Sequence, residues 1–137
     1  MNMMRTTTST TKIFKVAKNR GVSRIWMEGA FLSQKGIVKG FNKVIFSGLP
    51  TVEISRIIQD FVLPNKNLDG IYHLSAEPIN KFDLLKLIAE TYKKEIQITK
   101  DSSISINRAL DSTIFRNLTG FKPLSWPNLI QKMYEFK

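Results

Sequence analysis

Residues 44–58 read VIFSGLPTVEISRII, and this stretch decides the fold that we expect. Its first three residues, Val44 to Phe46, are apolar and typical of a strand, which the glycine and proline of the Ser-Gly-Leu-Pro turn then interrupt. The hydroxyl of Thr51 is predicted to cap a helix that begins there. The stretch therefore predicts a strand, a tight turn and a helix. The apolar residues of that helix recur at helical spacing and are expected to form one buried stripe: Ile54, Ile57, Ile58, Phe61 and Val62.

Similar patterns along the chain predict an α/β fold with several helices around one small sheet of four or five short strands. Asn80, with Asp83 three residues later, is predicted to cap the strongest helix. A weak helix is expected over 12–19 and a second helix over 23–33. A short helix is expected to be capped by Asp111 or Ser112 and to end at Gly120, and a terminal helix is expected after Ser125. The remaining strands are expected at 36–40, 43–46, 71–76 and 96–99.

The strongest helix and the terminal helix have clear apolar faces. The face of the first is expected to consist of Phe82, Leu85, Ile88 and Tyr92, widened by Leu84 and Ala89. The face of the second is expected to consist of Leu129, Ile130 and Met133.

Composition limits the protein class. With 137 residues, of which 42% are hydrophobic, the chain is long enough for one domain with a real core. The absence of cysteine excludes a disulfide framework and a cysteine nucleophile. No apolar run approaches the roughly 18–20 residues that cross a bilayer, so we expect a soluble, cytoplasmic protein.

The positive charge is concentrated in the first third of the chain. Residues 1–43 contain nine Lys or Arg and one Glu, a net charge of +8, whereas residues 44–137 contain twelve basic and ten acidic residues, a net charge of +2. Such a segment could contact phosphates, or it could be a solvated arm. Because no aromatic residues are interleaved with the lysines for base stacking, we do not expect a nucleic-acid partner.

No catalytic grouping is evident. The single histidine, His73, lies within a predicted strand, where a structural role is favoured over general base chemistry. The acidic residues do not cluster as metal ligands do, so no metal site is predicted. Neither the G-x-G-x-x-G spacing nor the Walker spacing occurs, so this sequence has no recognisable cradle for a dinucleotide or a triphosphate.

Two places could line a ligand site. The turn of Ser47, Gly48, Leu49, Pro50 and Thr51 precedes a helix, whose free backbone N–H groups could meet an oxygen-rich or phosphorylated ligand; the alternative is an ordinary strand-helix turn. Arg108 lies just before a capped helix and suits bidentate phosphate contact; the alternative is a surface ion pair with Asp111 or another acid.

Several segments together resemble the C-terminal part of dTDP-4-dehydrorhamnose reductase-like proteins, which are nucleotide-sugar reductases of the extended short-chain dehydrogenase/reductase class. The segments are FLSQKGIVKGFNKVIFSGLPTVEISRIIQDFV from Phe31, GIYHLSAEPINKFDLLKLIAETY from Gly70, NRALDSTIFRNLTGF from Asn107 and WPNLIQKM from Trp126. They occur in the family's order with similar spacing, over about three quarters of the chain.

The resemblance implies the substrate-binding lobe of such an enzyme at residues 31–137, preceded by a poorly matching basic segment at 1–30 and without the Rossmann half. It implies that the turn at 47–51 and Arg108 help to bind a dTDP- or UDP-linked sugar. It implies NADPH or NADH for the full-length family, although this chain lacks the Gly-rich turn and any Tyr-x-x-x-Lys pair. We therefore expect no cofactor and no turnover with this chain alone.

Two kinds of protein partner are compatible with the resemblance. In the alternative function, the chain is a non-enzymatic interaction module that docks a separately encoded Rossmann-domain chain. A second copy of this chain is another expected partner, and no membrane partner is expected.

Overall fold

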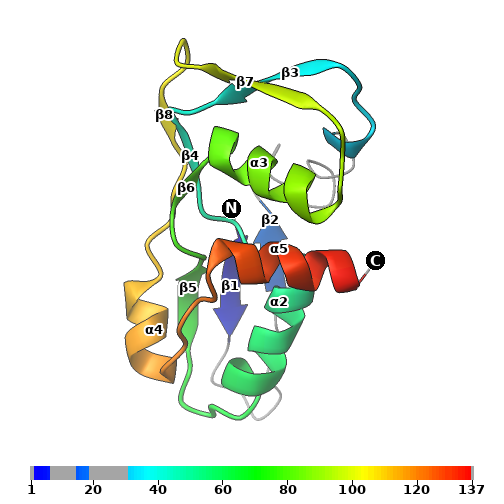
Figure 1. The fold of residues 1–137 in the computed structure, drawn as a ribbon. Helices are drawn as coiled ribbons and strands as arrows, with labels where there is room; N and C mark the ends of the chain where they lie inside the picture. The colour runs from blue at the N-terminus through cyan, green and yellow to red at the C-terminus, as the bar shows by residue number, and fades with distance from the viewer. Residues whose placement is uncertain (1, 7–14, 19–30, 137) are drawn as a thin grey trace.

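The structure is a computed structural model that describes residues 2–6, 15–18 and 31–136. Figure 1 shows a mixed α/β fold in which helices pack among short strands. The described strands are β1 (Asn2–Thr6), β2 (Lys15–Lys18), β3 (Ile37–Phe41), β4 (Val44–Phe46), β5 (Gly70–Leu74), β6 (Ile79–Asn80), β7 (Gln97–Asp101) and β8 (Ile106–Asn107). The described helices are α2 (Thr51–Ile57), the π-helical segment η1 (Ile58–Val62), α3 (Lys81–Thr91), α4 (Thr113–Thr119) and α5 (Trp126–Glu135).

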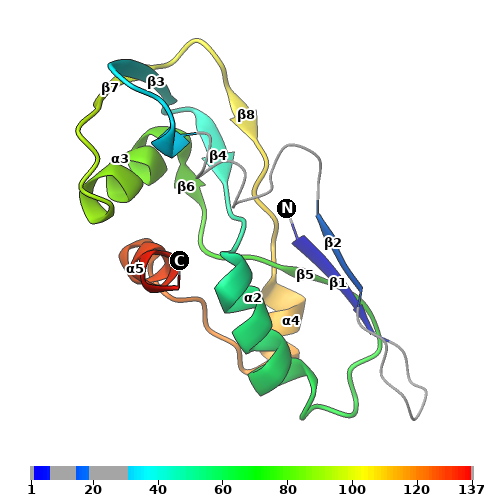
Figure 2. The same ribbon diagram turned by 90° about the vertical axis from the view of Figure 1, so that its right-hand side faces the viewer.

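The described strands form three small sheets, in the orders β2-β1-β5, β3-β7 and β6-β4-β8. The expected single sheet was therefore wrong, although the α/β class is confirmed. The strands β3 and β7 are parallel, with Ile37 opposite Gln97. In Figures 1 and 2 they lie at one end of the molecule, with α3 against them and α5 beyond α3. Because all three sheets are short, side-chain packing between the elements must supply most of the stability.

The N-terminal part differs from expectation. Residues 15–18 are the strand β2, so the weak helix expected over 12–19 was wrong. β-sheet pairing decides this segment, because β2 pairs antiparallel with β1, and β1 pairs antiparallel with β5. The helix expected over 23–33 falls largely outside the described residues, and Phe31 and Leu32 are helical where the description resumes.

The helix after the Ser-Gly-Leu-Pro turn is confirmed, and its predicted cap is wrong. Pro50 occupies the N-cap position without a side-chain cap hydrogen bond, and Thr51 is the first helical residue. Proline cannot donate a backbone hydrogen bond, so it suits this position at the start of a helix. The apolar stripe is confirmed: three of its residues are buried and the other two, Ile58 and Phe61, pack against the core.

The helix α3 has the predicted start. The Asn80 side chain accepts a hydrogen bond from the backbone N–H of Asp83 at 2.9 Å and donates to the Asp83 carboxylate at 2.7 Å. Most of its core face is also confirmed, since Leu84, Leu85 and Ile88 are buried and Ala89 and Tyr92 pack against the core, whereas Phe82 is only half-buried. A Cβ on Gly40 of β3 would lie 2.7 Å from the Phe82 ring, so glycine is what lets β3 approach α3 closely.

The last helices complete the core. Gly120 ends α4 in the left-handed conformation at φ 76°, as predicted. Trp126, Leu129, Ile130 and Met133 give α5 its buried face. None of the helices within residues 31–136 is both long and apolar enough to cross a lipid bilayer.

Candidate functional site

Three segments meet at the ends of β4, β5 and β8, and the predicted ligand-binding residues lie there. The backbone N–H of Arg108 donates to the Ile45 carbonyl at 2.9 Å. Two residues further along, the N–H of Leu110 donates to the hydroxyl of Ser47 at 2.8 Å, and the N–H of Ala76 donates to the Ser47 carbonyl at 2.8 Å. The turn, the end of β5 and the segment around Arg108 are thus joined through Ser47.

Three buried serines, Ser47, Ser75 and Ser112, which we name the serine cluster, hold this junction together. Their side chains are only 1–2% exposed. The Ser75 hydroxyl donates to the Leu110 carbonyl at 3.0 Å, and the Ser112 hydroxyl donates to the Ser75 carbonyl at 3.4 Å. Buried hydroxyls need partners because leaving one unsatisfied costs free energy. The serine cluster therefore fixes three segments that are far apart in the sequence.

Within the predicted turn, burial separates the residues into two groups. Ser47, Gly48, Leu49 and Pro50 are buried, and Thr51 is exposed. A Cβ on Gly48 would lie 2.6 Å from the ring of Phe46, which itself packs against Trp126 with ring centroids 6.1 Å apart. Among these residues, only Thr51 has a side chain that solvent can reach freely.

Arg108 lies on the surface beside this junction. Its side chain is exposed, and in the part of the chain that the structure describes it makes no ion pair with Asp111 or another acid. Asp111 instead accepts hydrogen bonds from the backbone and hydroxyl of Thr113. These hydrogen bonds, and more weakly the charges of Arg116 and His73, hold the pKa of Asp111 below its ordinary value. The guanidinium of Arg108 is thus available for a ligand.

A second arginine, Arg116 of α4, reaches the serine cluster and is not among the ligand-binding residues predicted from the sequence. Its Nε donates to the Ser112 hydroxyl at 2.7 Å, and its Nη1 lies 2.8 Å from the carboxylate of Glu77. The indole N–H of Trp126 donates to the Glu77 carbonyl at 2.7 Å. The i, i+4 spacing of Ser112 and Arg116 was the available signal, whereas nothing local indicates Glu77.

A buried carboxylate lies in the first turn of α2, where the sequence showed only scattered acids. Glu53 is 0% exposed. Its side chain accepts hydrogen bonds from Arg56, with Nε at 2.9 Å, and from Lys132 of α5 at 3.1 Å. The hydrogen bond with Glu53 raises the pKa of Arg56. Both partners are cations, and because Arg56 belongs to α2 and Lys132 to α5, Glu53 ties the two helices together.

His73 lies within β5, as predicted, and is exposed on the face opposite the core residues Tyr72 and Leu74. The described parts of the chain hold no group of three or more His, Cys, Asp or Glu side chains arranged to bind a metal ion.

Comparison with solved structures confirms the predicted resemblance at the level of the fold. The chain is similar to a dTDP-4-dehydrorhamnose reductase from Bacillus anthracis in complex with NADP, at a TM-score of 0.63 and 16% identity, over 82% of this chain. It is also similar to RMD from Pseudomonas aeruginosa complexed with NADPH, at a TM-score of 0.55 and 12% identity, over 86% of this chain. The chain spans 42% of the length of each. No family model matches the sequence, and no curated protein does.

Proposed function

We propose that this chain is the substrate-binding part of a dTDP-4-dehydrorhamnose reductase-like, NAD(P)H-dependent sugar-nucleotide reductase, and that it is inactive alone. The observation that carries the proposal is the fold: 82% of the chain aligns with the reductase from Bacillus anthracis and spans 42% of it. The proposed lobe is residues 31–137, with residues 1–30 as a basic segment that matches the family poorly and whose strand β1 pairs with β5 of the lobe. We place the reaction in the cytoplasm, in the assembly of deoxysugars for surface polysaccharide.

The proposed ligand-binding residues are Ser47, Gly48, Leu49, Pro50, Thr51 and Arg108. Their geometry supports a division of roles. Thr51 and Arg108 are exposed, so they contact the nucleotide sugar, and the Arg108 guanidinium suits the two phosphates because it donates parallel hydrogen bonds. The four residues of the turn are buried, so they act by fixing the backbone from which Thr51 and Arg108 extend.

No residue of this chain is assigned to catalysis. Reduction of a keto sugar needs hydride from NADPH or NADH and a proton donor. The sequence has neither a Gly-rich dinucleotide turn nor a Tyr-x-x-x-Lys pair. The proposal therefore places cofactor binding and proton transfer on a Rossmann domain outside this sequence.

A titration by two-dimensional amide NMR tests the ligand. The full chain is titrated with a dTDP-sugar and a UDP-sugar, and saturable shifts are expected around residues 47–51 and 108. Arg108→Gln should weaken binding about tenfold or more, because a charge-assisted contact to phosphate is lost. Lys122→Gln, a change at an exposed lysine outside the serine cluster, is the matched control and should leave affinity unchanged. A well-dispersed spectrum that responds to neither sugar nucleotide would refute the proposal.

A separate assay tests the claim of inactivity. Oxidation of NADPH is followed with a 4-keto sugar nucleotide, and none is expected above the rate without protein. Turnover by the purified chain would contradict this part of the proposal while leaving the ligand assignment intact.

The alternative is an interaction module that docks a separately encoded Rossmann-domain chain. Exposed apolar residues on α4 favour it: Ile114 and Leu118 are four residues apart, on one side of the helix, and are 70% and 55% exposed. Light scattering tests this alternative function, because an interaction module should form a complex of defined mass with a Rossmann-domain chain from the source cell. A monomer that binds no such chain would rule it out.

A further inference from the structure

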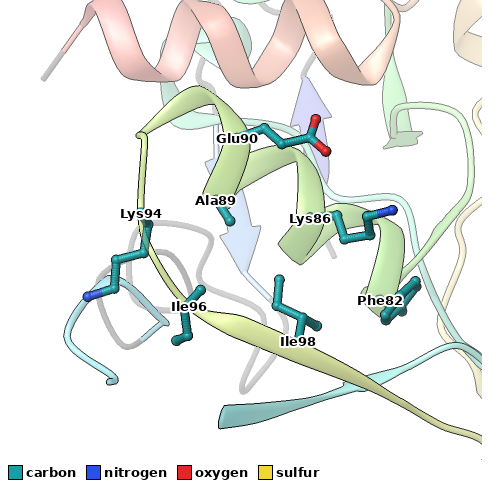
Figure 3. Close-up of a pocket in the computed structure, with 7 residues that line it drawn as sticks. All are labelled: Phe82, Lys86, Ala89, Glu90, Lys94, Ile96 and Ile98. Atoms are coloured by element: carbon teal, nitrogen blue, oxygen red, sulfur yellow. The ribbon is translucent and has the colours of Figure 1, made fainter. Parts of the chain in front are cut away.

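A groove runs along α3 beside the start of β7, and none of its lining residues belongs to the serine cluster (Figure 3). Its volume is about 430 Å³, within the range of small-ligand pockets. Phe82, Ala89, Ile96 and Ile98 form its apolar surface, and each of them is only half-buried. The groove therefore exposes an apolar surface to solvent, and this surface is small enough for one small molecule to cover.

Positive charges border this apolar surface. Lys86 on α3 and Lys94 on the segment after it line the groove, and Glu90 is the one carboxylate among its lining residues (Figure 3). Lys86 and Lys100 both place their ammonium groups over the ring of Phe82, at 5.6 and 5.1 Å from its centroid. The ring face attracts both cations, so two positive charges are held beside the apolar surface.

The backbone fixes the position of Lys94. Lys93 adopts the left-handed conformation at φ 53°, which is rare for residues other than glycine. This conformation lets the N–H of Lys94 donate to the carbonyl of Ala89 at 2.8 Å, which closes the end of α3. Lys94 is thus held at the edge of the groove.

We propose that this groove binds a small amphipathic anion, meaning one carboxylate, sulfonate or phosphate group joined to an apolar body. The apolar body covers Ala89, Ile96 and Ile98, which removes apolar surface from water. The anionic group pairs with Lys86, whose ammonium lies at the Phe82 end of the groove, and the charge of Lys94 at the other end adds to the attraction, because the two lysines outnumber Glu90 (Figure 3). The site is independent of the sugar-nucleotide function proposed above.

Octanoate is the probe, and octan-1-ol is its neutral counterpart. The full chain is titrated with each by two-dimensional amide NMR. Octanoate should give saturable shifts at Phe82, Ala89, Ile96 and Ile98, and octan-1-ol should bind at least about threefold more weakly, because it lacks the charge.

Variants then assign the binding to the groove. The double variant Lys86→Gln with Lys94→Gln should lower octanoate affinity about three- to tenfold, because the partly exposed ion pair with Lys86 and the positive charge of Lys94 are both lost. Lys66→Gln, at an exposed lysine in the loop after η1, is the matched control and should have no effect. Ala89→Phe fills the groove without changing its charge and should abolish the octanoate shifts. The amide spectrum of each variant without ligand shows that it is folded.

Several results would overturn the proposal. The first is the absence of saturable octanoate shifts up to about 10 mM, a concentration that would detect even millimolar affinity. The second is that octan-1-ol binds as tightly as octanoate, and the third is that Lys66→Gln loses as much octanoate affinity as the double variant. The fourth is that the octanoate shifts are confined to residues 47–51 and 108.

Discussion

Lys132 of α5 donates a hydrogen bond to Glu53 of α2 at 3.1 Å, across 79 residues of sequence. Glu53 is wholly buried, whereas the side chain of Lys132 is 39% exposed. The two members of this pair therefore differ in what their loss would leave behind. Removal of Lys132 leaves Glu53 paired with Arg56, while removal of the Glu53 charge leaves two cations that water can partly solvate.

Glu53→Gln is expected to lower the free energy of unfolding by about 2 kcal/mol, because three charge-assisted hydrogen bonds at a buried site, two from Arg56 and one from Lys132, are weakened. Lys132→Met should cost less, about 1 kcal/mol or below, since its ammonium is partly solvated. Urea unfolding followed by tryptophan fluorescence measures both. A larger loss for Lys132→Met than for Glu53→Gln would contradict this account of the pair.

Ser47→Ala is expected to destabilise the protein by about 1–3 kcal/mol, because the part-buried N–H of Leu110 loses its acceptor. Ser55→Ala is the matched control, since the Ser55 hydroxyl donates to the Thr51 carbonyl on the exposed face of α2. Its effect should stay within about 0.5 kcal/mol. Chemical denaturation of the two variants side by side decides the question, and equal losses would show that the serine cluster is not a stabilising junction.

Lys93→Gly is expected to stabilise the protein by about 0.5–1 kcal/mol. Lys93 holds a φ of 53°, which glycine adopts without the steric cost that a Cβ imposes. Glu95→Gly, two residues further on and at a φ outside the left-handed region, should instead destabilise by about 0.5–1 kcal/mol. Thermal melts of the two variants show whether each change raises or lowers the stability. A lower Tm for Lys93→Gly than for the unchanged chain would contradict the helix-end geometry.

Asp111 should contribute to stability above pH 4 and lose that contribution in acid. Hydrogen bonds from Thr113 place its pKa in the folded chain below its ordinary value. Because the folded pKa is the lower one, the unfolded chain takes up a proton first as the pH falls below about 4, and this favours unfolding. Asp111→Asn keeps an acceptor for the Thr113 N–H but cannot titrate.

Melting curves of Asp111→Asn and of the unchanged chain are compared from pH 6 to pH 3. The fall in Tm with acid should be smaller for Asp111→Asn than for the unchanged chain. Equal slopes over this range would show that the Asp111 carboxylate does not contribute to the pH dependence of stability.

The predictions that held rest on signals within one turn or one element. The start of α3 followed from Asn80 and Asp83, which bond across three residues. The end of α4 followed from Gly120, because only glycine adopts the left-handed conformation cheaply. The buried faces of α3 and α5 followed from helical periodicity. Local patterns also misled twice: Thr51 has the right side chain for a cap but lies one residue too late, and residues 15–18 form a strand where a weak helix was expected.

The sequence by itself determined the α/β class, the helices from Asn80 and Ser125, and the two segments proposed to bind a ligand, because each depends on neighbours along the chain. Tertiary structure alone decided that β3 pairs with β7, that Ser47 bonds to Leu110 across 63 residues, and that Glu53 meets Lys132. It also decided that most of the predicted turn is buried while Arg108 stays exposed. These contacts form between distant residues once the apolar faces pack, so no local pattern records them.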